Sequence, residues 1–443
     1  MESHPLQRAS EAFRAGRLDE AAELCRAVLA REPFSPETNH LLGVIYFRQG
    51  KSVAARDFLA RATASPAATA EMHNNFGAVL DAIGDTERAA AAFGAAIALQ
   101  PGFAQAYNNL GVIHRNAGRT ASAIESFRRA LASAPDLAET RNNLRSAYRD
   151  VIPPWHFAMM DDARRNDAYE AAILRAVKGK RVLDIGTGAG LLAMLAAKGG
   201  AASVTTCESV GVIAYQAREI IAQNGFADRV KVVAKPSTEL AVGKDMAAPA
   251  EVLVTEVFSS GLTNEDILPT LEHAHLHLLA KDAAIIPAAG AAVGYLAGGE
   301  VLRGMLFVDK VKGLDLSLFN DFAPPVLGIA LDGFPHEIFS DDFDIIRFDF
   351  RAHNFSMETV AREVTVTRSG PCVGLAQWIK LELDAQSTYE NRPSPNAGDN
   401  GHWTHILYRF PEVLQVKPGD VIRLNVRHDR THISVDFVEH VRR

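Results

Sequence analysis

The sequence predicts a multi-domain protein of three parts. These are an all-α repeat solenoid over residues 1–151, an α/β domain with a parallel sheet over 152–287, and a β-barrel domain over 288–443. Three observations predict this order: a 34-residue period in the first part, a glycine turn between an apolar strand and a helix in the second, and alternating apolar and polar residues in the third. A length of 443 residues suits about three domains.

The composition is ordinary for a soluble globular protein, with 48% hydrophobic and 22% charged residues. The chain has no long uncharged apolar stretch, and its N-terminus lacks the apolar core of a secretory signal. Cys25, Cys207 and Cys372 share no metal-like spacing and are expected to be buried small hydrophobes. We therefore expect a cytoplasmic protein with no metal site and no membrane contact. A net charge of −7 disfavours direct nucleic-acid binding and suits a basic protein partner.

The first part repeats small and large residues at a fixed step. Glycines recur every 34 residues: Gly16, Gly50, Gly84 and Gly118. A second series marks the first helix of the later units: Gly43, Gly77 and Gly111. Alanines keep the same step from Ala21, and a larger apolar residue follows each by four positions. Small residues let paired helices approach closely, while the large residue fills the groove between them. The pattern resembles the tetratricopeptide repeat and predicts four units over about residues 4–139, then a capping helix.

Asparagines follow the same period at Asn75, Asn109 and Asn143, and each has a second asparagine before it. A side-chain amide can both donate and accept hydrogen bonds. A ladder that includes Asn75 and Asn109 on the concave surface is therefore predicted to hold an extended peptide. The alternative is that these asparagines cap or bridge neighbouring helices.

The second part alternates short apolar strands with helices, which predicts a doubly wound parallel sheet. Its main motif is Asp184 followed by a turn with Gly186, Gly188 and Gly190. These glycines let the backbone turn tightly against a ligand, and the following helix N-terminus favours an anionic group. Glu208 ends the second strand, where a carboxylate can accept hydrogen bonds from both ribose hydroxyls. A nicotinamide enzyme is the alternative, but its turn has the spacing G-x-G-x-x-G.

The glycine turn between Asp184 and Glu208 resembles that of class I S-adenosylmethionine methyltransferases. The stretch from Trp155 to the C-terminus is similar to protein arginine N-methyltransferases, especially the branch with N-terminal tetratricopeptide repeats. The resemblance implies S-adenosyl-L-methionine as the cofactor.

The helical stretch that begins at Trp155 resembles the family's N-terminal helix, which closes over the cofactor. By that match Arg165 would pair with the cofactor carboxylate, Asp162 would lie near the substrate, and Met159 would border the substrate pocket. The turn that ends in Glu239 resembles the family's adenine-contacting turn.

Glu256 and Glu265 resemble the two acids of the family's double-glutamate loop. A guanidinium is always charged, and two carboxylates can hold it through bidentate hydrogen bonds. This would direct one nitrogen at the sulfonium methyl group, so that orientation and electrostatics supply most of the acceleration. Glu256 ends an apolar strand, where a buried acid needs a reason.

His402 and Trp403 resemble the family's Thr-His-Trp loop, although position 401 is glycine here. By resemblance, His402 would pair with Asp162 and help to accept the released proton, and Trp403 would wall the arginine pocket. Phe319 and Phe322 lie in a segment that resembles one between the family's barrel strands, and a place in the core would explain them.

These motifs imply a protein arginine N-methyltransferase whose repeats recruit an arginine-containing protein or peptide. The family often forms head-to-tail dimers through an arm, so we expect a homodimer. Two alternatives are a repeat scaffold with a catalytically silent methyltransferase domain, and a small-molecule methyltransferase.

Overall fold

The computed structural model describes residues 5–152, 155–394 and 403–443. The chain divides into two compact units, Met1–Pro154 and Trp155–Arg443. Because each unit has its own internal contacts, each is described by itself.

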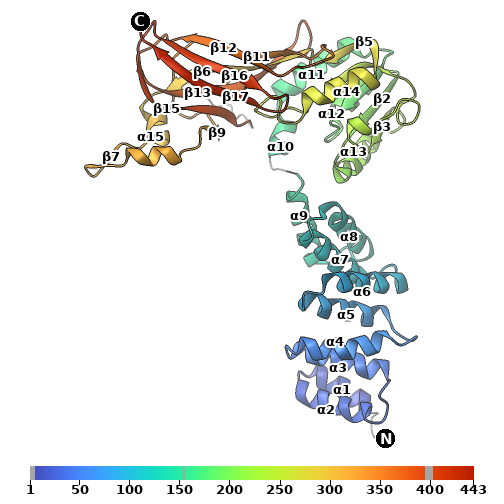
Figure 1. Ribbon diagram of the computed structural model, residues 1–443. Coiled ribbons are helices and arrows are strands. Elements are labelled where there is room, and N and C mark those ends of the chain that lie inside the picture. The colour runs from blue at the N-terminus through green and yellow to red at the C-terminus, as the bar shows by residue number, and fades with distance from the viewer. Residues whose placement is uncertain (1–4, 153–154, 395–402) are drawn as a thin grey trace. The chain divides into compact units, whose positions relative to one another are not determined.

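Helices make up the described part of the first unit (Figure 1). They are α1 (Pro5–Arg14), α2 (Leu18–Leu29), α3 (Pro36–Arg48), α4 (Ser52–Thr63), α5 (Ala70–Ala82), α6 (Thr86–Leu99), α7 (Ala104–Asn116), α8 (Thr120–Ser133) and α9 (Ala138–Arg149). Helices α1 to α8 pack as four consecutive pairs, and α9 packs on α8. This arrangement confirms the helical solenoid in the predicted fold class.

Close helix packing explains one of the two glycine series. A Cβ atom on each of these glycines would lie 2.5–2.6 Å from a side-chain atom of the paired helix: Gly43 on Leu59, Gly77 on Phe93, and Gly111 on Phe127. Real Cβ atoms do not come so close, so any larger residue would push the paired helices apart.

The other glycine series has a different physical reason from the one we predicted. These residues follow the first helix of each pair with φ between 72° and 82°, and a Cβ atom on them would meet nothing within 4 Å: Gly16, Gly50, Gly84 and Gly118. They provide the left-handed conformation that ends a helix, as the bond from the N–H of Arg119 to the carbonyl of His114 shows. The explanation by close helix approach is wrong for this series.

The second unit begins with a parallel sheet. Its strands are β1 (Arg181–Ile185), β2 (Ser203–Cys207), β3 (Val230–Val233), β4 (Ala250–Thr255) and β5 (Leu279–Ile286), in the order β3-β2-β1-β4-β5. The helical segments around them are α10 (Trp155–Met160), α11 (Ala163–Ala176), α12 (Leu191–Lys198), α13 (Gly211–Gln223), η1 (Ser237–Glu239) and α14 (Ile267–His277). The strand order reverses between β1 and β4, and ligands bind such sheets at the carboxyl ends of these strands.

Antiparallel strands follow, as predicted. They are β6 (Ala289–Gly298), β7 (Lys310–Val311), β8 (Leu314–Asp315), β9 (Val326–Ile329), β10 (Glu337–Ile338), β11 (Phe343–Asp349), β12 (Glu358–Thr365), β13 (Gly370–Glu382), β14 (Thr388–Glu390), β15 (His405–Val416), β16 (Val421–His428) and β17 (Ile433–Val441). A seven-stranded sheet includes β6, β13 and β15, and a three-stranded sheet contains β12, β16 and β17. Between β6 and β9 the chain also forms α15 (Glu300–Leu306) and η2 (Ser317–Phe322).

One hydrophobic core joins the parallel sheet to the antiparallel sheets. It includes Leu183 of β1, Val254 of β4, Leu375 of β13 and Ile422 of β16. This shared core holds the carboxyl ends of β1 and β4 in a fixed relation to the antiparallel strands.

Candidate active site

The glycine turn after β1 leaves room for a ligand only because it has no side chains. Gly186 has φ of 90°, and a Cβ atom there would lie 2.6 Å from Cγ1 of Val257, the residue after Glu256. Gly188 also has positive φ, and a Cβ atom on it would meet nothing within 4 Å. Gly190, with φ of 85°, begins α12. The turn therefore presents open space and backbone N–H groups, as a bound nucleoside requires.

Asp184 lies in β1 directly before this turn and is almost fully buried. One carboxylate oxygen, Oδ2, accepts a 2.6 Å hydrogen bond from the hydroxyl of Thr206. The other oxygen, Oδ1, is buried without a partner among the described residues. Burial raises the pKa of Asp184 to about 7, although the bond from Thr206 opposes this. A buried acceptor without a partner among the described residues is what a donor on a bound ligand would satisfy.

Glu208 lies against the same turn. Its carboxylate accepts the N–H of Gly188 at 3.2 Å with Oε2 and the N–H of Val210 at 3.0 Å with Oε1. Each oxygen keeps a second lone pair for a ligand hydroxyl, so the geometry fits the predicted ribose contact. Helix α10 lies near Glu208. Burial lowers the pKa of His156 in that helix, and the negative charge of Glu208 opposes this effect. Glu239 is exposed at the end of η1, whereas Ser237 in the same turn is buried.

A buried ion pair joins α11 to the carboxyl end of β4. Nη2 of Arg165 lies 2.8 Å from Oε2 of Glu256, and both side chains are at most 6% exposed. Arg165 also donates to Oδ1 of Asn166 at 2.9 Å, and its guanidinium carbon lies 5.6 Å from the ring centroid of Tyr169. The Nε of Arg165 is buried without a partner among the described residues. The guanidinium therefore still has a donor for a carboxylate, which is the predicted role of Arg165.

The acids of the site affect one another electrostatically. Burial raises the pKa of Glu256, and Arg165 opposes that rise. The charges of Glu265 and Asp162 raise it further. Burial also raises the pKa of Glu265, although this residue has solvent access. The structure thus brings Asp162, which is distant in the sequence, near the two glutamates of the loop.

The loop between the two glutamates has a strained backbone. Leu262 has φ of 64° although it is fully buried, and Asp266 has φ of 58° where α14 begins. Such conformations cost about 1–3 kcal/mol for residues with side chains and persist only where the surroundings hold them. Gln377 of β13 contributes, because its Nε2 donates to the carbonyl of Ser260 at 3.1 Å.

Asp162 connects α11 to the antiparallel part of the unit. Its Oδ1 accepts the backbone N–H of Arg165 at 3.0 Å, so Asp162 caps the helix that carries Arg165. Its Oδ2 accepts the hydroxyl of Tyr389 at 2.7 Å. The indole of Trp403 lies beside Tyr389, where it opposes the rise that burial and Asp162 cause in the pKa of that hydroxyl. Trp403 is therefore near Asp162, and its predicted role as a wall of the arginine pocket stays a prediction. Met159 is half-buried in α10, and the predicted pair of His402 with Asp162 lies outside the described residues.

The asparagines of the first unit bridge neighbouring repeats. Nδ2 of Asn109 donates to Oδ1 of Asn74 at 3.0 Å. Asn75 makes the equivalent contact with Nε2 of His40 at 2.9 Å, one repeat earlier. The bridging alternative thus describes these side chains, and peptide binding by them stays a prediction.

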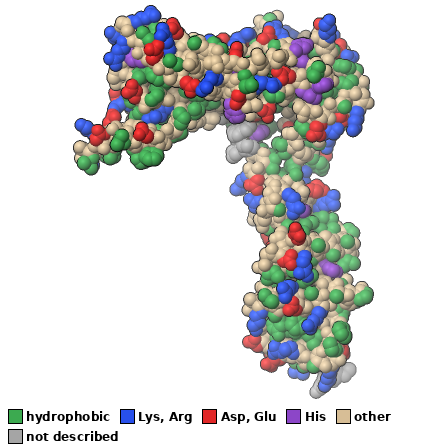
Figure 2. Space-filling view, viewed as in Figure 1, with side chains coloured by type: hydrophobic (Ala, Val, Ile, Leu, Met, Phe, Trp, Pro, Cys, Tyr) green, Lys and Arg blue, Asp and Glu red, His purple; other side chains and the backbone are tan. Residues whose placement is uncertain are grey.

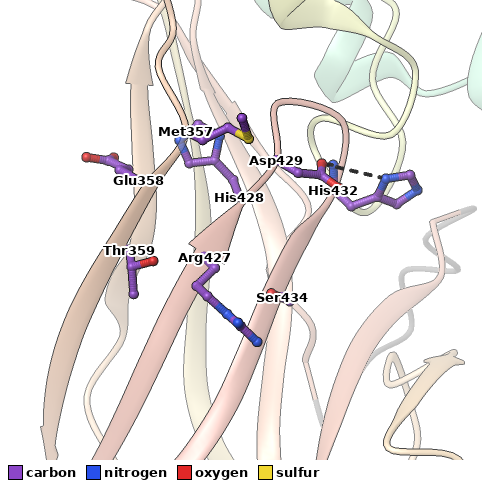
Figure 3. A pocket seen from close by; sticks show the side chains of 8 residues that line it. All are labelled: Met357, Glu358, Thr359, Arg427, His428, Asp429, His432 and Ser434. Atoms are coloured by element: carbon purple, nitrogen blue, oxygen red, sulfur yellow. Dashed lines mark hydrogen bonds and ion pairs between the residues drawn. The ribbon is translucent and has the colours of Figure 1, made fainter.

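Outside this site, the described structure has a surface pocket that includes paired charged residues. The pocket lies over β12, β16 and β17 and has Arg427, Asp429 and His432 in its lining (Figure 3). Arg427 pairs with Asp436 at 2.6 Å, and Asp429 lies 3.9 Å from His432. Within the described ranges, no group of three or more His, Cys, Asp or Glu residues has a metal-binding arrangement. In the same residues, no helix has the length and apolar character to cross a membrane.

The sequence did not indicate three residues of the site: Thr206, Asn166 and Tyr389. Thr206 lies two residues before Glu208 and Asn166 directly follows Arg165, so closeness to these motif residues was the only signal for them. Tyr389 lies in a short strand outside any motif, and only its contact with Asp162 reveals it.

Comparisons with known proteins agree with this geometry. A tetratricopeptide repeat family model matches residues 6–69 and 76–138, which confirms the predicted repeats. The model of ribosomal protein L11 methyltransferase (PrmA) matches residues 168–275. The Trypanosoma brucei PRMT1 enzyme-prozyme heterotetrameric complex with AdoHcy has a similar fold, with a TM-score of 0.55 at 22% identity, over 66% of this chain and 95% of that one.

One relative shows the family, and a second resembles the chain over part of its length. An arginine N(omega)-methyltransferase from Streptomyces achromogenes subsp. streptozoticus is 34% identical over 280 residues, which are 63% of this chain and 77% of the relative. Protein arginine N-methyltransferase 7 from Oryza sativa subsp. indica is 31% identical over 313 residues, 62% of this chain but only 44% of the relative. The chain thus spans less than half the length of that second relative. On the first match, it belongs to the arginine N-methyltransferase family, with a fold that uses S-adenosylmethionine.

Proposed function

We propose that this chain transfers a methyl group from S-adenosylmethionine to the guanidinium of arginine residues in proteins. One observation supports this most directly: Glu256 already binds a guanidinium, that of Arg165, at 2.8 Å in a buried setting. A carboxylate placed to hold one guanidinium suits a second, and Glu265 lies close enough for its charge to raise the pKa of Glu256.

The residues around the glycine turn would hold the cofactor. Gly186, Gly188 and Gly190 leave space for it, Glu208 would accept its ribose hydroxyls, and Asp184 would take a nearby donor. Glu239 would lie at its adenine. Arg165 would bind its carboxylate through the donor that has no partner now. When bound, S-adenosylmethionine supplies a methyl group on a positively charged sulfur.

The chain's own acids would orient the acceptor. Glu256 and Glu265 would hold the guanidinium by charge-assisted hydrogen bonds and leave one nitrogen directed at the methyl group. Met159 and Trp403 would enclose the acceptor. Asp162 would pair with His402, which would take up the proton that the methylated nitrogen loses.

The first unit would recruit the protein substrate, because tetratricopeptide arrays have an extended concave surface that suits peptides. Asn75 and Asn109 are the side chains proposed to contact that peptide. Their bridges to neighbouring repeats would hold them in place for it.

We further propose a homodimer formed through the arm between β6 and β9. Figure 2 shows hydrophobic side chains on this arm. Leu318 is 82% exposed, Phe319 is 69% exposed and Phe322 is 80% exposed, so the core position considered for Phe319 and Phe322 is wrong. An apolar patch of this kind on a soluble protein marks an interaction surface. Light scattering should show a dimer for the wild type and a monomer for Leu318→Asp with Phe322→Asp; a wild-type monomer would contradict the dimer.

Methyl transfer from labelled S-adenosylmethionine tests the proposed reaction. The acceptors are an arginine-rich protein, its Arg→Lys counterpart and free arginine. We expect label on the arginine-rich protein alone, and mass spectrometry then gives the methylation state. Label on the Arg→Lys protein would reject arginine as the acceptor.

A second candidate acceptor is free arginine. The Streptomyces relative, matched over 77% of its length, is named for arginine without mention of a protein. Label on free arginine but not on the arginine-rich protein would favour this small-molecule reaction. Cofactor binding without transfer to any acceptor would favour the silent scaffold.

A further inference from the structure

Two aromatic residues, one in β14 and one just before β15, lie near the cap of α11. Tyr389 is in β14 and donates to Oδ2 of Asp162 at 2.7 Å. Trp403 precedes β15, and its indole lies close enough to Tyr389 to lower the pKa of that hydroxyl against the effect of burial. Tyr389 is held by the pairing of β14 with β13, opposite Leu381, whereas Trp403 stands before its strand begins and depends on how the start of β15 is held.

The side chain of His405 lies between these two ends. His405 is the first residue of β15 and is fully buried. Its Nδ1 accepts the backbone N–H of Leu331 at 3.3 Å, and its Nε2 lies 3.0 Å from the carbonyl oxygen of Asn391. Since Nδ1 accepts, the ring proton is on Nε2 and is donated to Asn391. The imidazole is therefore neutral. It joins His405, two residues after Trp403, to Asn391, which directly follows β14.

Asn391 is itself hydrogen-bonded to the sheet. Its backbone N–H donates to the carbonyl of Ile379 at 3.3 Å, and its side-chain Oδ1 accepts the N–H of Ile379 at 2.9 Å. Ile379 is a fully buried residue of β13. His405 thus ties the end of the segment to a point that is already fixed, two residues from Tyr389.

We propose that His405 is a positioning residue for methyl transfer, which holds Tyr389 and Trp403 in register around Asp162. Its bond to Asn391 carries this role. The inference rests on the proposed function, since Asp162 and Trp403 belong to the acceptor side of that site. Losing the bond would release the start of β15 from this fixed point and let Trp403 shift relative to Tyr389, and a displacement of about 1 Å at a reacting centre can cost about 100-fold in rate.

Two amide substitutions separate the two bonds of the imidazole. Gln reaches as far as Nε2, so His405→Gln keeps a donor for the carbonyl of Asn391. Asn is shorter and reaches only as far as Nδ1, so His405→Asn keeps an acceptor for Leu331 but loses the bond to Asn391. We expect kcat within about threefold of wild type for His405→Gln and at least about tenfold lower for His405→Asn. The affinity for S-adenosylhomocysteine, measured by calorimetry, should stay unchanged in both.

His336 provides a matched control in the same part of the molecule. It is also buried, and both ring nitrogens have partners: the hydroxyl of Tyr295 at 2.7 Å and the carbonyl of Phe334 at 2.8 Å. It does not touch the segment between β14 and β15 through these bonds. His336→Asn should lower the melting temperature as His405→Asn does, but it should leave kcat near wild type.

The outcomes divide clearly. Equal kcat for His405→Asn and His405→Gln, or an equal loss of kcat in His336→Asn, would overturn the positioning role. Tyr389→Phe gives an independent check, because it removes the bond to Asp162 without touching His405 and should reproduce the loss of kcat; full activity in this variant would also overturn it. A wild-type chain without transfer to any arginine acceptor would instead reject the proposed function.

Discussion

The repeat unit and the catalytic unit bury polar side chains in opposite ways. In the repeats, Asn74 is 6% exposed and has a regular partner, Asn109, whose amide donates to it at 3.0 Å. In the catalytic unit, Asp184 is 1% exposed, keeps one oxygen without a partner among the described residues, and has its pKa raised to about 7. Both are polar groups in a protein interior, but only the second is left partly unsatisfied.

The difference follows from how each set of residues arises in the sequence. The asparagines recur with the helical repeat, so each copy can pair with the next copy and satisfy its amide. The acids of the proposed site come from segments that meet at the carboxyl ends of β1 and β4. Buried acids that converge in this way carry perturbed pKa values, which mark functional sites rather than packing.

The largest effect should come from the guanidinium clamp, which is the proposed pair of Glu256 and Glu265. Glu256→Gln keeps the shape of the side chain but removes its charge, so it should lower kcat by about 1,000-fold, as loss of a main electrostatic contact does. S-adenosylhomocysteine binding should persist, since the glycine turn and Glu208 are untouched. Single-turnover transfer and calorimetry would measure the two quantities.

A carboxylate at the other end of β4 is the control. Glu251 pairs with Lys180 and Arg181, at 3.4 and 3.2 Å, and is partly exposed. Glu251→Gln should therefore leave kcat near wild type. Full activity in Glu256→Gln would remove the contrast between the two units, because the buried acid would then be structural.

The next effect should come from packing in the repeats. A Cβ atom at Gly111 would lie 2.5 Å from the ring of Phe127, which is fully buried. Gly111→Ala should therefore lower the free energy of unfolding by about 2 kcal/mol, as overpacking does. Gly94→Ala is the matched change, because a Cβ atom at that helical position meets nothing within 4 Å. It should raise stability by up to about 1 kcal/mol. Equal effects in denaturant unfolding would show that the close approach does not decide the glycine.

Periodicity allowed the contacts of the repeats to be predicted before the structure. The step that links Gly77 to Phe93 places a small residue opposite a large one, and the structure confirms that contact. The reason for Gly118 was misjudged because a glycine signals both small size and a left-handed backbone. The sequence alone does not say which of these two properties a position uses.

The site was predictable only where a motif and a strand end coincide. Gly186 and Glu256 follow neighbouring strands of a parallel sheet, and the carboxyl ends of such strands meet. The ion pair of Arg165 with Glu256 and the bond of Tyr389 to Asp162 join distant segments. No spacing rule encodes such pairs, because they depend on how the antiparallel strands pack on the parallel sheet.

A smaller effect concerns pH. Burial raises the pKa of Glu256, and the clamp needs its ionised form, so kcat/KM for the acceptor should fall about tenfold per unit below that raised pKa. The acceptor guanidinium stays charged throughout, so it does not cause this limb. Stability should move the other way. Between the ordinary and the raised pKa the folded state binds more protons than the unfolded state, so the free energy of unfolding decreases as pH rises.

Asp184→Asn separates the two buried acids in that profile. If Glu256 sets the acid limb, the limb should persist in this variant at saturating cofactor, even though Asp184 has a raised pKa of its own. An acid limb that disappears would assign it to Asp184 instead.

The smallest effect tests whether the repeat asparagines only bridge. Asn109→Ala removes the donor to Asn74 and should lower the stability of the repeats by about 1 kcal/mol, whereas Asn142→Ala should change it little because Asn142 is exposed. Binding of an arginine-containing substrate to Asn109→Ala with Asn75→Ala then decides between two roles. Unchanged affinity would leave these asparagines as bridges alone, in keeping with the contrast between the units. A weakened affinity with the repeats still folded would mean that the same amides also hold the peptide, and that satisfied, periodic polar groups can carry function as well.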